Sequence, residues 1–280
     1  MHVTRTIDET RTALRPWPSV AFVPTMGALH DGHLSLVRRA RELAERVVVS
    51  IFVNPTQFGP GEDLARYPRP IDRDLELCRD AGVDLVFGPT PDVMYPPHEI
   101  ETMIDVPSLT SLLEGAHRPG HFVGVCRVVA KLLHIVQPAV ACFGMKDYQQ
   151  LRVIESMVAA LCLPVEIQRC PTVREPDGLA MSSRNVYLHD SQRRHALGLS
   201  KAVREAERLI ADGEISPSRI EGAMRQVIQA HHIELDYAVV RDARTLTPVD
   251  VINPALEPVV CLVAGRLGDV RLIDNIVIDR

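Results

Sequence analysis

The sequence predicts an α/β protein, in which a mostly parallel β-sheet with helices on both faces is followed by a smaller α+β domain. Over roughly the first 170 residues, short β-branched and aromatic runs alternate with stretches of helical periodicity. After residue 185 two long helical stretches come first and the strands follow them. The 280 residues, of which 46% are hydrophobic, are enough to form two unequal cores.

Five runs are the predicted strands of the sheet: residues 20–23, 47–53, 85–87, 140–143 and 165–167. Between the first two, Leu34, Val37 and Ala40 fall on one helical face, which predicts an amphipathic crossover helix. Further helices are predicted over 72–81, 123–136 and 148–161, because a glycine or proline follows each within a few residues. The alternation therefore predicts parallel strands joined by helices.

The remaining segments divide into loops and a C-terminal domain. Residues 55–70 contain four prolines, and 55–70, 94–98 and 115–120 are predicted to be mobile loops. Helices are expected over 191–211 and 216–231, with strands over 235–240, 259–263 and 275–278. We place the boundary near 173–184, which gives a catalytic domain over 1–174 and a C-terminal α+β domain over 175–280.

Composition narrows the class of protein. The formal net charge of −5 gives no general attraction for nucleic acid, and no apolar run is long enough to cross a bilayer. The N-terminus lacks the apolar core of a secretory signal, and the six cysteines form no Cys-x-x-Cys pair. We therefore expect a cytoplasmic protein with reduced cysteines and no nucleic-acid or membrane partner.

The sharpest local pattern is Pro-Thr-Met-Gly-Ala-Leu-His-Asp-Gly-His over residues 24–33, between a predicted strand and a predicted helix. Ligands of parallel sheets bind beyond the carboxyl ends of the strands, where a helix N-terminus offers free N–H groups. Gly27 and Gly32 would let the backbone approach a phosphate, and His30 and His33 would donate hydrogen bonds to developing charge. The alternative is a pair of surface or capping histidines.

Two later segments have the same chemical character. Lys146 stands at the end of the strand over 140–143, where its ammonium group could reach a phosphate. Ser182, Ser183 and Arg184 follow in a loop that could wrap a triphosphate, since arginine supplies a planar fork of donors. Ordinary helix starts and turns are the alternatives for both segments.

Neutral and acidic side chains complete the set of candidates. Gln57 follows the second strand and could bind a small polar substrate, or it could be a loop glutamine in water. Asp72 and Asp74 are interpreted mainly as helix-start charges. No three candidate metal ligands converge in the sequence, so we predict no metal site built from protein alone.

These motifs resemble a known family. The His-x-Gly-His pattern with a later Met-Ser-Ser-Arg loop is similar to the Rossmann-like nucleotidyltransferase superfamily. The strings PTMGALHDGH, FVNPTQF, RPGHF, FGMKDYQQL and PTVREPDGLAMSSRN together closely resemble the pantoate–β-alanine ligase (pantothenate synthetase) family, over about residues 20–188. The resemblance implies a two-step ligation: pantoate attacks the α-phosphorus of ATP to give pantoyl adenylate and pyrophosphate, and β-alanine then displaces AMP.

The resemblance also implies residue roles, Mg²⁺ carried with the ATP, and a homodimer. His33 would be the proton donor, with His30, Lys146, Ser182, Ser183 and Arg184 as the other catalytic residues. Gln57 and Gln150 would bind pantoate, and Gln57 would also contact β-alanine. The implied ATP-binding residues are Met26, Gly27, Ala28, Leu29, His30, Asp31, Gly32, His33, Gly144, Met145, Lys146, Asp147, Val173, Met181, Ser182, Ser183 and Arg184.

Two positions depart from the family pattern, and two other functions stay open. Met145 stands where a charged or polar residue is common, and Arg127 stands where threonine is common, facing either the crevice or a subunit contact. One alternative function is transfer of AMP or CMP to a phosphate acceptor, since fold alone does not fix the acceptor. The other is a regulatory nucleotide-binding module without turnover, in which ATP would bind and not react.

Overall fold

The computed structural model describes residues 1–279 and divides into two compact units. The first unit comprises Met1–Met145 together with Gln150–Pro171. The second comprises Lys146–Gln149 together with the chain from Thr172 onward. The short segment Lys146–Gln149 thus packs with the C-terminal part of the chain, although it follows a strand of the first unit in sequence.

A six-stranded sheet forms the centre of the first unit, and every strand pair in it is parallel. The spatial order is β1-β4-β3-β2-β5-β6, so the predicted parallel sheet is confirmed. Valine, isoleucine and phenylalanine fill its inner strands because both faces are covered. The strands are β1 (His2–Thr4), β2 (Ala21–Thr25), β3 (Val47–Ile51), β4 (Leu85–Phe87), β5 (Val140–Gly144) and β6 (Glu166–Cys170).

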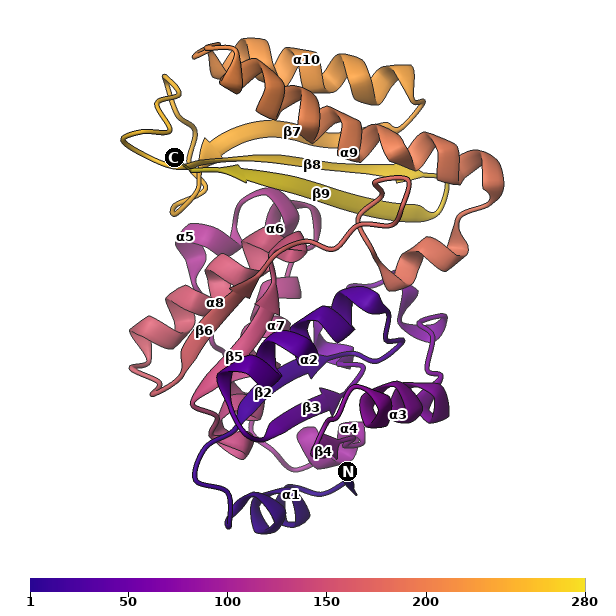
Figure 1. The fold of residues 1–280 in the computed structure, drawn as a ribbon, viewed down its shortest axis with the longest axis vertical. Coiled ribbons are helices and arrows are strands. Elements are labelled where there is room, and N and C mark those ends of the chain that lie inside the picture. The colour runs from indigo at the N-terminus through magenta and orange to yellow at the C-terminus, as the bar shows by residue number, and fades with distance from the viewer. Residues whose placement is uncertain (280) are drawn as a thin grey trace. The chain divides into compact units, whose positions relative to one another are not determined.

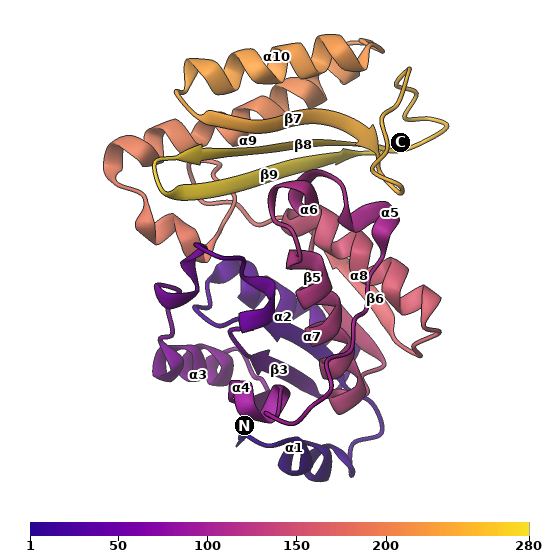
Figure 2. The same ribbon diagram turned by 180° about the vertical axis from the view of Figure 1, so that it is seen from behind.

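Helices cover both faces of this sheet, which makes the fold doubly wound. Helix α2 (Asp31–Leu43) and helix α3 (Ile71–Asp80) contribute Val37, Ala40 and Cys78 to a core beneath one face. Figures 1 and 2 show α2 on one side of the strands and α7 (His121–Val136) on the other. Helix α8 (Tyr148–Ala160) connects β5 to β6. The arrangement confirms the predicted Rossmann-like class.

The order of the strands places the candidate site. The chain passes from β2 to β3 and β4 on one side, whereas β5 and β6 lie on the other side of β2. In open parallel sheets, ligands bind beyond the carboxyl ends of the strands at such a switch point. Residues 26–30 follow β2 there, the 3-10 helix η1 (Pro55–Gln57) follows β3, and η3 (Met145–Asp147) follows β5.

Several short elements lie outside the predicted pattern. Strand β1 and helix α1 (Ile7–Leu14) precede β2, and Thr6 caps α1 by accepting from the Glu9 amide while the Glu9 carboxylate accepts from the Thr6 amide. The predicted loops contain short helical turns as well. Helix η2 (Asp63–Ala65) lies in the loop over 55–70, and α6 (Leu113–His117) overlaps the loop over 115–120, whereas α4 (Pro91–Met94) meets the loop over 94–98 only at Met94 and α5 (Pro107–Thr110) lies outside all three.

The second unit has the α+β architecture predicted for the C-terminal part of the chain. Three antiparallel strands, β7 (Glu234–Asp242), β8 (Val259–Leu267) and β9 (Val270–Ile278), lie in that order. Helices α9 (Asp190–Ala211) and α10 (Pro217–Ala230) cover one face of the sheet, as Figure 1 shows, and bury their apolar stripes against it. The 3-10 helix η4 (Ser183–Tyr187) precedes α9.

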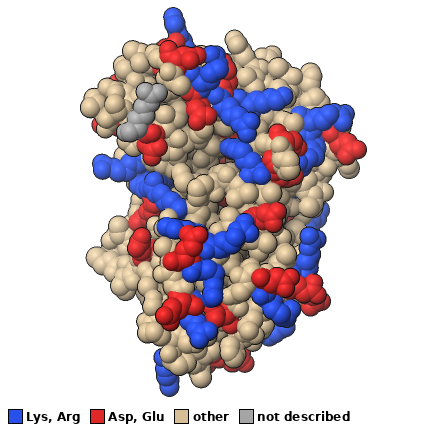
Figure 3. Space-filling view, viewed as in Figure 1, with Lys and Arg blue, Asp and Glu red and all other residues tan. Residues whose placement is uncertain are grey.

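Charged side chains of both signs are intermingled on the face that Figure 3 draws. Many are paired locally, as where Arg208 bridges Glu205 and Asp212 near the end of α9. Among residues 1–279, no helix combines the length and the apolar character needed to span a membrane.

Candidate active site

The turn after β2 has its shape fixed by a carboxylate from α3. Gly27 and Ala28 both have positive φ values, 78° and 50°. The buried Asp74 carboxylate accepts the backbone N–H groups of Ala28 and Leu29, each at 2.8 Å. A Cβ atom on Gly27 would lie 2.9 Å from Asp74 Oδ2 and 3.0 Å from the Ile51 side chain. Glycine is therefore required both for the backbone conformation and for the close approach of Asp74.

The packing of Asp74 gives Gly27 a structural role and adds a residue that the motif does not include. The Ala28 and Leu29 amides donate to Asp74, and the close approach of the Asp74 carboxylate makes glycine at position 27 necessary for the packing of the turn. The interpretation of Asp74 as mainly a helix-start charge is incomplete, since its main contacts are these two amides. Burial raises the pKa of the Asp74 carboxyl above its ordinary value, against the opposing effect of the two amide bonds.

The paired histidines lie on the first turn of α2. His30 is the N-cap residue and His33 is at the third helical position, with ring centroids 4.1 Å apart. His33 Nδ1 accepts the His30 backbone N–H at 3.4 Å. A neutral imidazole that accepts at Nδ1 carries its proton on Nε2, so His33 presents a donor. The positive end of the helix dipole lies at the same place, which favours an anion.

Gln57 is held beside Met26 by side-chain hydrogen bonds. Its Oε1 accepts from Asn54 Nδ2 at 3.0 Å, and its Nε2 lies 3.1 Å from Met26 Sδ. Asn54 is buried and also donates to the Gly124 carbonyl at 3.2 Å. These contacts fix which side of the Gln57 amide is the donor side. The structure therefore brings together Met26 and Gln57, two of the predicted site residues.

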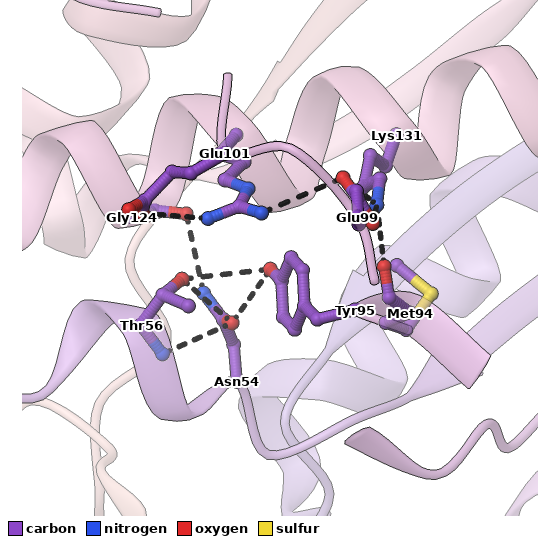
Figure 4. A network of polar contacts seen from close by, with 9 residues as sticks. Asn54, Thr56, Met94, Tyr95, Glu99, Glu101, Gly124 and Lys131 are labelled. Carbon is purple, nitrogen blue, oxygen red and sulfur yellow. Dashed lines mark hydrogen bonds and ion pairs between the residues drawn. The ribbon is translucent and has the colours of Figure 1, made fainter. Parts of the chain in front are cut away.

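A polar network, drawn in Figure 4, supports Asn54. The Tyr95 hydroxyl donates to Asn54 Oδ1 at 2.8 Å. Arg127, only 8% exposed, lies with its guanidinium 4.7 Å from the Tyr95 ring centroid and pairs with Glu101 and Glu99. The side chain of Arg127 thus contacts Tyr95 and the two glutamates of the segment that follows Tyr95. Burial raises the pKa of Tyr95, which keeps the hydroxyl as a donor.

Two residues of the Arg-Pro-Gly-His-Phe segment, Arg118 and His121, make structural contacts that the sequence did not predict. His121 is buried, its Nδ1 donates to the Gln57 carbonyl at 2.8 Å, and its Nε2 accepts from Arg118 at 3.1 Å. Burial, followed by the nearby Arg118 charge, lowers the pKa of His121 to about 4. Arg118 in turn binds the Glu62 carboxylate with two contacts of 2.8 Å. His121 is therefore a neutral support for the Gln57 backbone.

Gly144, Met145 and Gln150 complete the predicted site residues of the first unit. Gly144 ends β5, and a Cβ built on it would meet nothing within 4 Å, so the space above it is open. Met145 and Gln150 are half-buried and lie on either side of the Lys146–Gln149 segment in sequence. Asp31 is exposed at the first position of α2, and Gly32 beside it is half-buried.

The other predicted ATP residues belong to the second unit. Lys146 and Asp147 lie in η3, and the Met181 amide donates to the Val173 carbonyl at 3.0 Å. Ser182 is the N-cap of η4 and accepts the Arg184 amide at 3.2 Å. Across this loop, Asn185 Nδ2 donates to the Ala180 carbonyl and to the Glu175 carboxylate. Ser182, Ser183 and Arg184 are half-buried at the start of that short helix.

Five of the six cysteines, Cys78, Cys126, Cys142, Cys170 and Cys261, are buried free thiols, and Cys162 is an exposed free thiol. Burial raises the pKa of the Cys78, Cys126 and Cys261 thiols to about 12. Within residues 1–279, no group of three or more His, Cys, Asp or Glu side chains could hold a metal ion.

Comparison with known proteins gives one consistent result. A family model for pantoate-beta-alanine ligase matches residues 2–277. A pantothenate synthetase from Gluconobacter oxydans (strain 621H) is 51% identical over 276 residues, which cover 98% of this chain and 99% of the relative. The crystal structure of pantothenate synthetase from Thermus thermophilus matches with a TM-score of 0.95 and 46% identity, covering 100% of both chains. A pantoate-beta-alanine ligase from Francisella tularensis, complexed with beta-gamma ATP and beta-alanine, matches at a TM-score of 0.81 and 31% identity, covering 99% and 97% of the two chains.

Proposed function

The chain belongs to the pantoate-beta-alanine ligase family, and from that premise we propose how its own residues carry out the reaction. The enzyme joins pantoate to β-alanine to form pantothenate, and ATP is a substrate. The observation that carries the residue assignment is the His30–His33 pair on the first turn of α2, beyond the carboxyl end of β2.

The first half-reaction is formation of an acyl adenylate. A carboxylate oxygen of pantoate attacks the α-phosphorus, the bond to the bridging oxygen breaks, and pyrophosphate leaves with its electron pair. The pantoate carboxylate is itself the nucleophile, so the protein supplies positioning and charge stabilisation. His33 Nε2–H and the Lys146 ammonium donate to the phosphate oxygens as negative charge builds up, with His30 and the Ser182, Ser183 and Arg184 group completing the donors.

Substrate binding and the second half-reaction use the neutral glutamines. Gln57, whose donor side is set by Asn54, and Gln150 hold pantoate, and Gln57 also contacts β-alanine. The neutral amine of β-alanine then attacks the acyl carbon, the bond between that carbon and the phosphate oxygen of AMP breaks, AMP leaves with the electron pair, and the nitrogen releases a proton to solvent. Mg²⁺ enters with the ATP as part of the substrate and neutralises triphosphate charge. The ATP contacts extend over Met26–His33, Gly144–Asp147, Val173 and Met181–Arg184.

We further propose that the enzyme acts in the cytoplasm as a homodimer. The free buried thiols fit a reducing compartment. Ile100 and Met103 are 89% and 75% exposed, and apolar side chains at such positions provide surface for a second copy. Sedimentation velocity tests this proposal: the dimer predicts about twice the mass of a 31.1 kDa chain, and a single species of monomer mass would refute it.

Exchange of labelled pyrophosphate into ATP tests the adenylate half-reaction. We expect exchange to require pantoate and to proceed without β-alanine, because reversal of adenylation is enough to label ATP. His33→Ala and Lys146→Ala should each reduce it by at least about a hundredfold, the typical effect of a lost transition-state donor. Lys201→Ala, on α9, is the matched control for loss of one cation. Wild-type exchange in both site variants would refute the assigned roles, and exchange without any acid would refute the acyl-adenylate route.

A further inference from the structure

Two neighbouring residues of β9 contact two segments of the proposed triphosphate site within the second unit. Asp274 pairs with Arg174, which begins the loop that leads to Ser182. Asn275 Nδ2 donates to the Lys146 carbonyl at 2.7 Å. Successive side chains of a strand point to opposite faces. One strand therefore holds the loop from one face and the lysine segment from the other.

The Asp274–Arg174 contact is buried and bidentate. The two oxygens of Asp274 lie 2.6 and 2.9 Å from the two terminal nitrogens of Arg174, and the Asp274 side chain is only 1% exposed. Arg174 also donates to the Gly178 carbonyl and forms an isolated β-bridge with Ala180. A carboxylate buried this deeply needs its cation, since removal of one partner leaves an uncompensated charge. The pair therefore fixes the hairpin that ends where the serine pair begins.

The lysine segment is held in a comparable way. Asn275 is 5% exposed, and its amide reaches the backbone of Lys146 itself. Two residues further along, the buried Tyr148 hydroxyl donates to the Ala243 carbonyl at 2.8 Å. With the backbone fixed at both points, the position of the Lys146 ammonium depends mainly on its own side-chain torsions. A fixed donor costs no reorganisation when charge develops during the reaction.

We propose that Asp274 and Asn275 are positioning residues for adenylation, which set the spacing between Lys146 and the Ser182–Arg184 loop. The C-terminal sheet is then a part of the catalytic apparatus. Asn275 acts through Lys146, and Asp274 acts through Arg174 on the loop. This inference rests on the proposed roles of Lys146 and of Arg184.

The test measures pantoate-dependent pyrophosphate exchange in full-length Asn275→Asp and Asp274→Asn variants. Asn275→Asp keeps the shape of the side chain and removes the donor. We expect exchange kcat to fall about tenfold or more in each variant, the loss expected when a fixed donor is displaced, while the KM for pantoate stays within about twofold. Asp236→Asn is the matched control, because Asp236 is a carboxylate of the same sheet whose ion pair, at 2.7 Å, is with Arg271 of that sheet. Its kcat should stay within about twofold of wild type.

A double-mutant cycle distinguishes a positioning role from a general loss of structure. In a Lys146→Ala background, Asn275→Asp should cause little further loss, because the group it positions has been removed. The same fold loss in both backgrounds would overturn the positioning role, as would wild-type kcat in both β9 variants. If Asp274→Asn does not fold, Arg174→Lys keeps the charge, loses the bidentate contact and should show the same kcat effect. Wild-type exchange in Lys146→Ala would instead overturn the underlying site assignment.

Discussion

Gly124 lies where α7 comes closest to the turn that carries Gln57. A Cβ atom built on Gly124 would lie 2.2 Å from the Thr56 carbonyl oxygen, 2.5 Å from its carbon and 2.7 Å from the Gln57 amide nitrogen. All three are backbone atoms, so no side-chain rotation can relieve the overlap. Gly124→Ala must therefore push α7 and η1 apart.

The displacement and its cost follow from these distances. Non-bonded Cβ contacts are essentially never closer than about 3.0 Å, so the 2.2 Å contact must lengthen by roughly 0.8 Å. Overpacking of this kind costs about 1–3 kcal/mol. Alanine in a helix would otherwise gain about 1 kcal/mol over glycine. We expect a net loss of up to about 2 kcal/mol, together with a shift of Gln57 away from Asn54.

Thermal unfolding and pantoate-dependent exchange measure the two consequences. For a chain of this size, a loss of up to about 2 kcal/mol lowers Tm by up to about 8 °C. The KM for pantoate should rise several-fold while the KM for ATP changes less, because the turn carries Gln57. The control is Gly222→Ala in α10, where the new Cβ meets nothing within 4 Å, so Tm should rise by about 2–4 °C. A higher Tm for Gly124→Ala with wild-type pantoate KM would refute the argument.

Three further substitutions test the residues that hold the proposed site in place. Because the pKa of His121 is about 4 in the fold and 6.5 unfolded, the unfolded chain binds more protons between these values, and stability falls as pH drops. The loss should total about 3 kcal/mol, and urea unfolding of His121→Gln across pH 7 to 4 should show a flatter profile. Asp74→Asn should lower Tm by several degrees and raise the KM for ATP, because one backbone amide of the turn loses its acceptor. Tyr95→Phe removes the hydrogen-bond donor to Asn54. The KM for pantoate should therefore rise about threefold to tenfold, while Tm changes little. An unchanged KM would show that Tyr95 does not help to position Gln57.

The hydrophobic periodicity of strands and helices was sufficient to predict most of the fold. The runs at 47–53 and 140–143 predicted β3 and β5 because inner parallel strands are almost wholly apolar. Strand β1 was missed because its three residues, one of them buried, are too few to show an alternation. Helix α1 was missed because it is a mainly polar helix whose start depends on a capping box rather than on an apolar stripe.

The candidate site likewise contains residues that the sequence predicts and residues that it does not. Residues that face a ligand in the proposed mechanism, such as His30, His33 and Ser182, lie in short contiguous motifs that are visible in the sequence. The residues that hold these motifs in place lie far along the chain: Asp74 is 45 residues from Leu29, and Asn275 is 129 residues from Lys146. A helix-start aspartate and a strand asparagine carry no local signal for such contacts, since the pairing is set by tertiary packing. Positioning residues come from distant parts of the chain, whereas ligand-facing residues lie together in short motifs. Variants at Asp74, Asp274 and Asn275 therefore test the positioning residues separately from the ligand-facing ones.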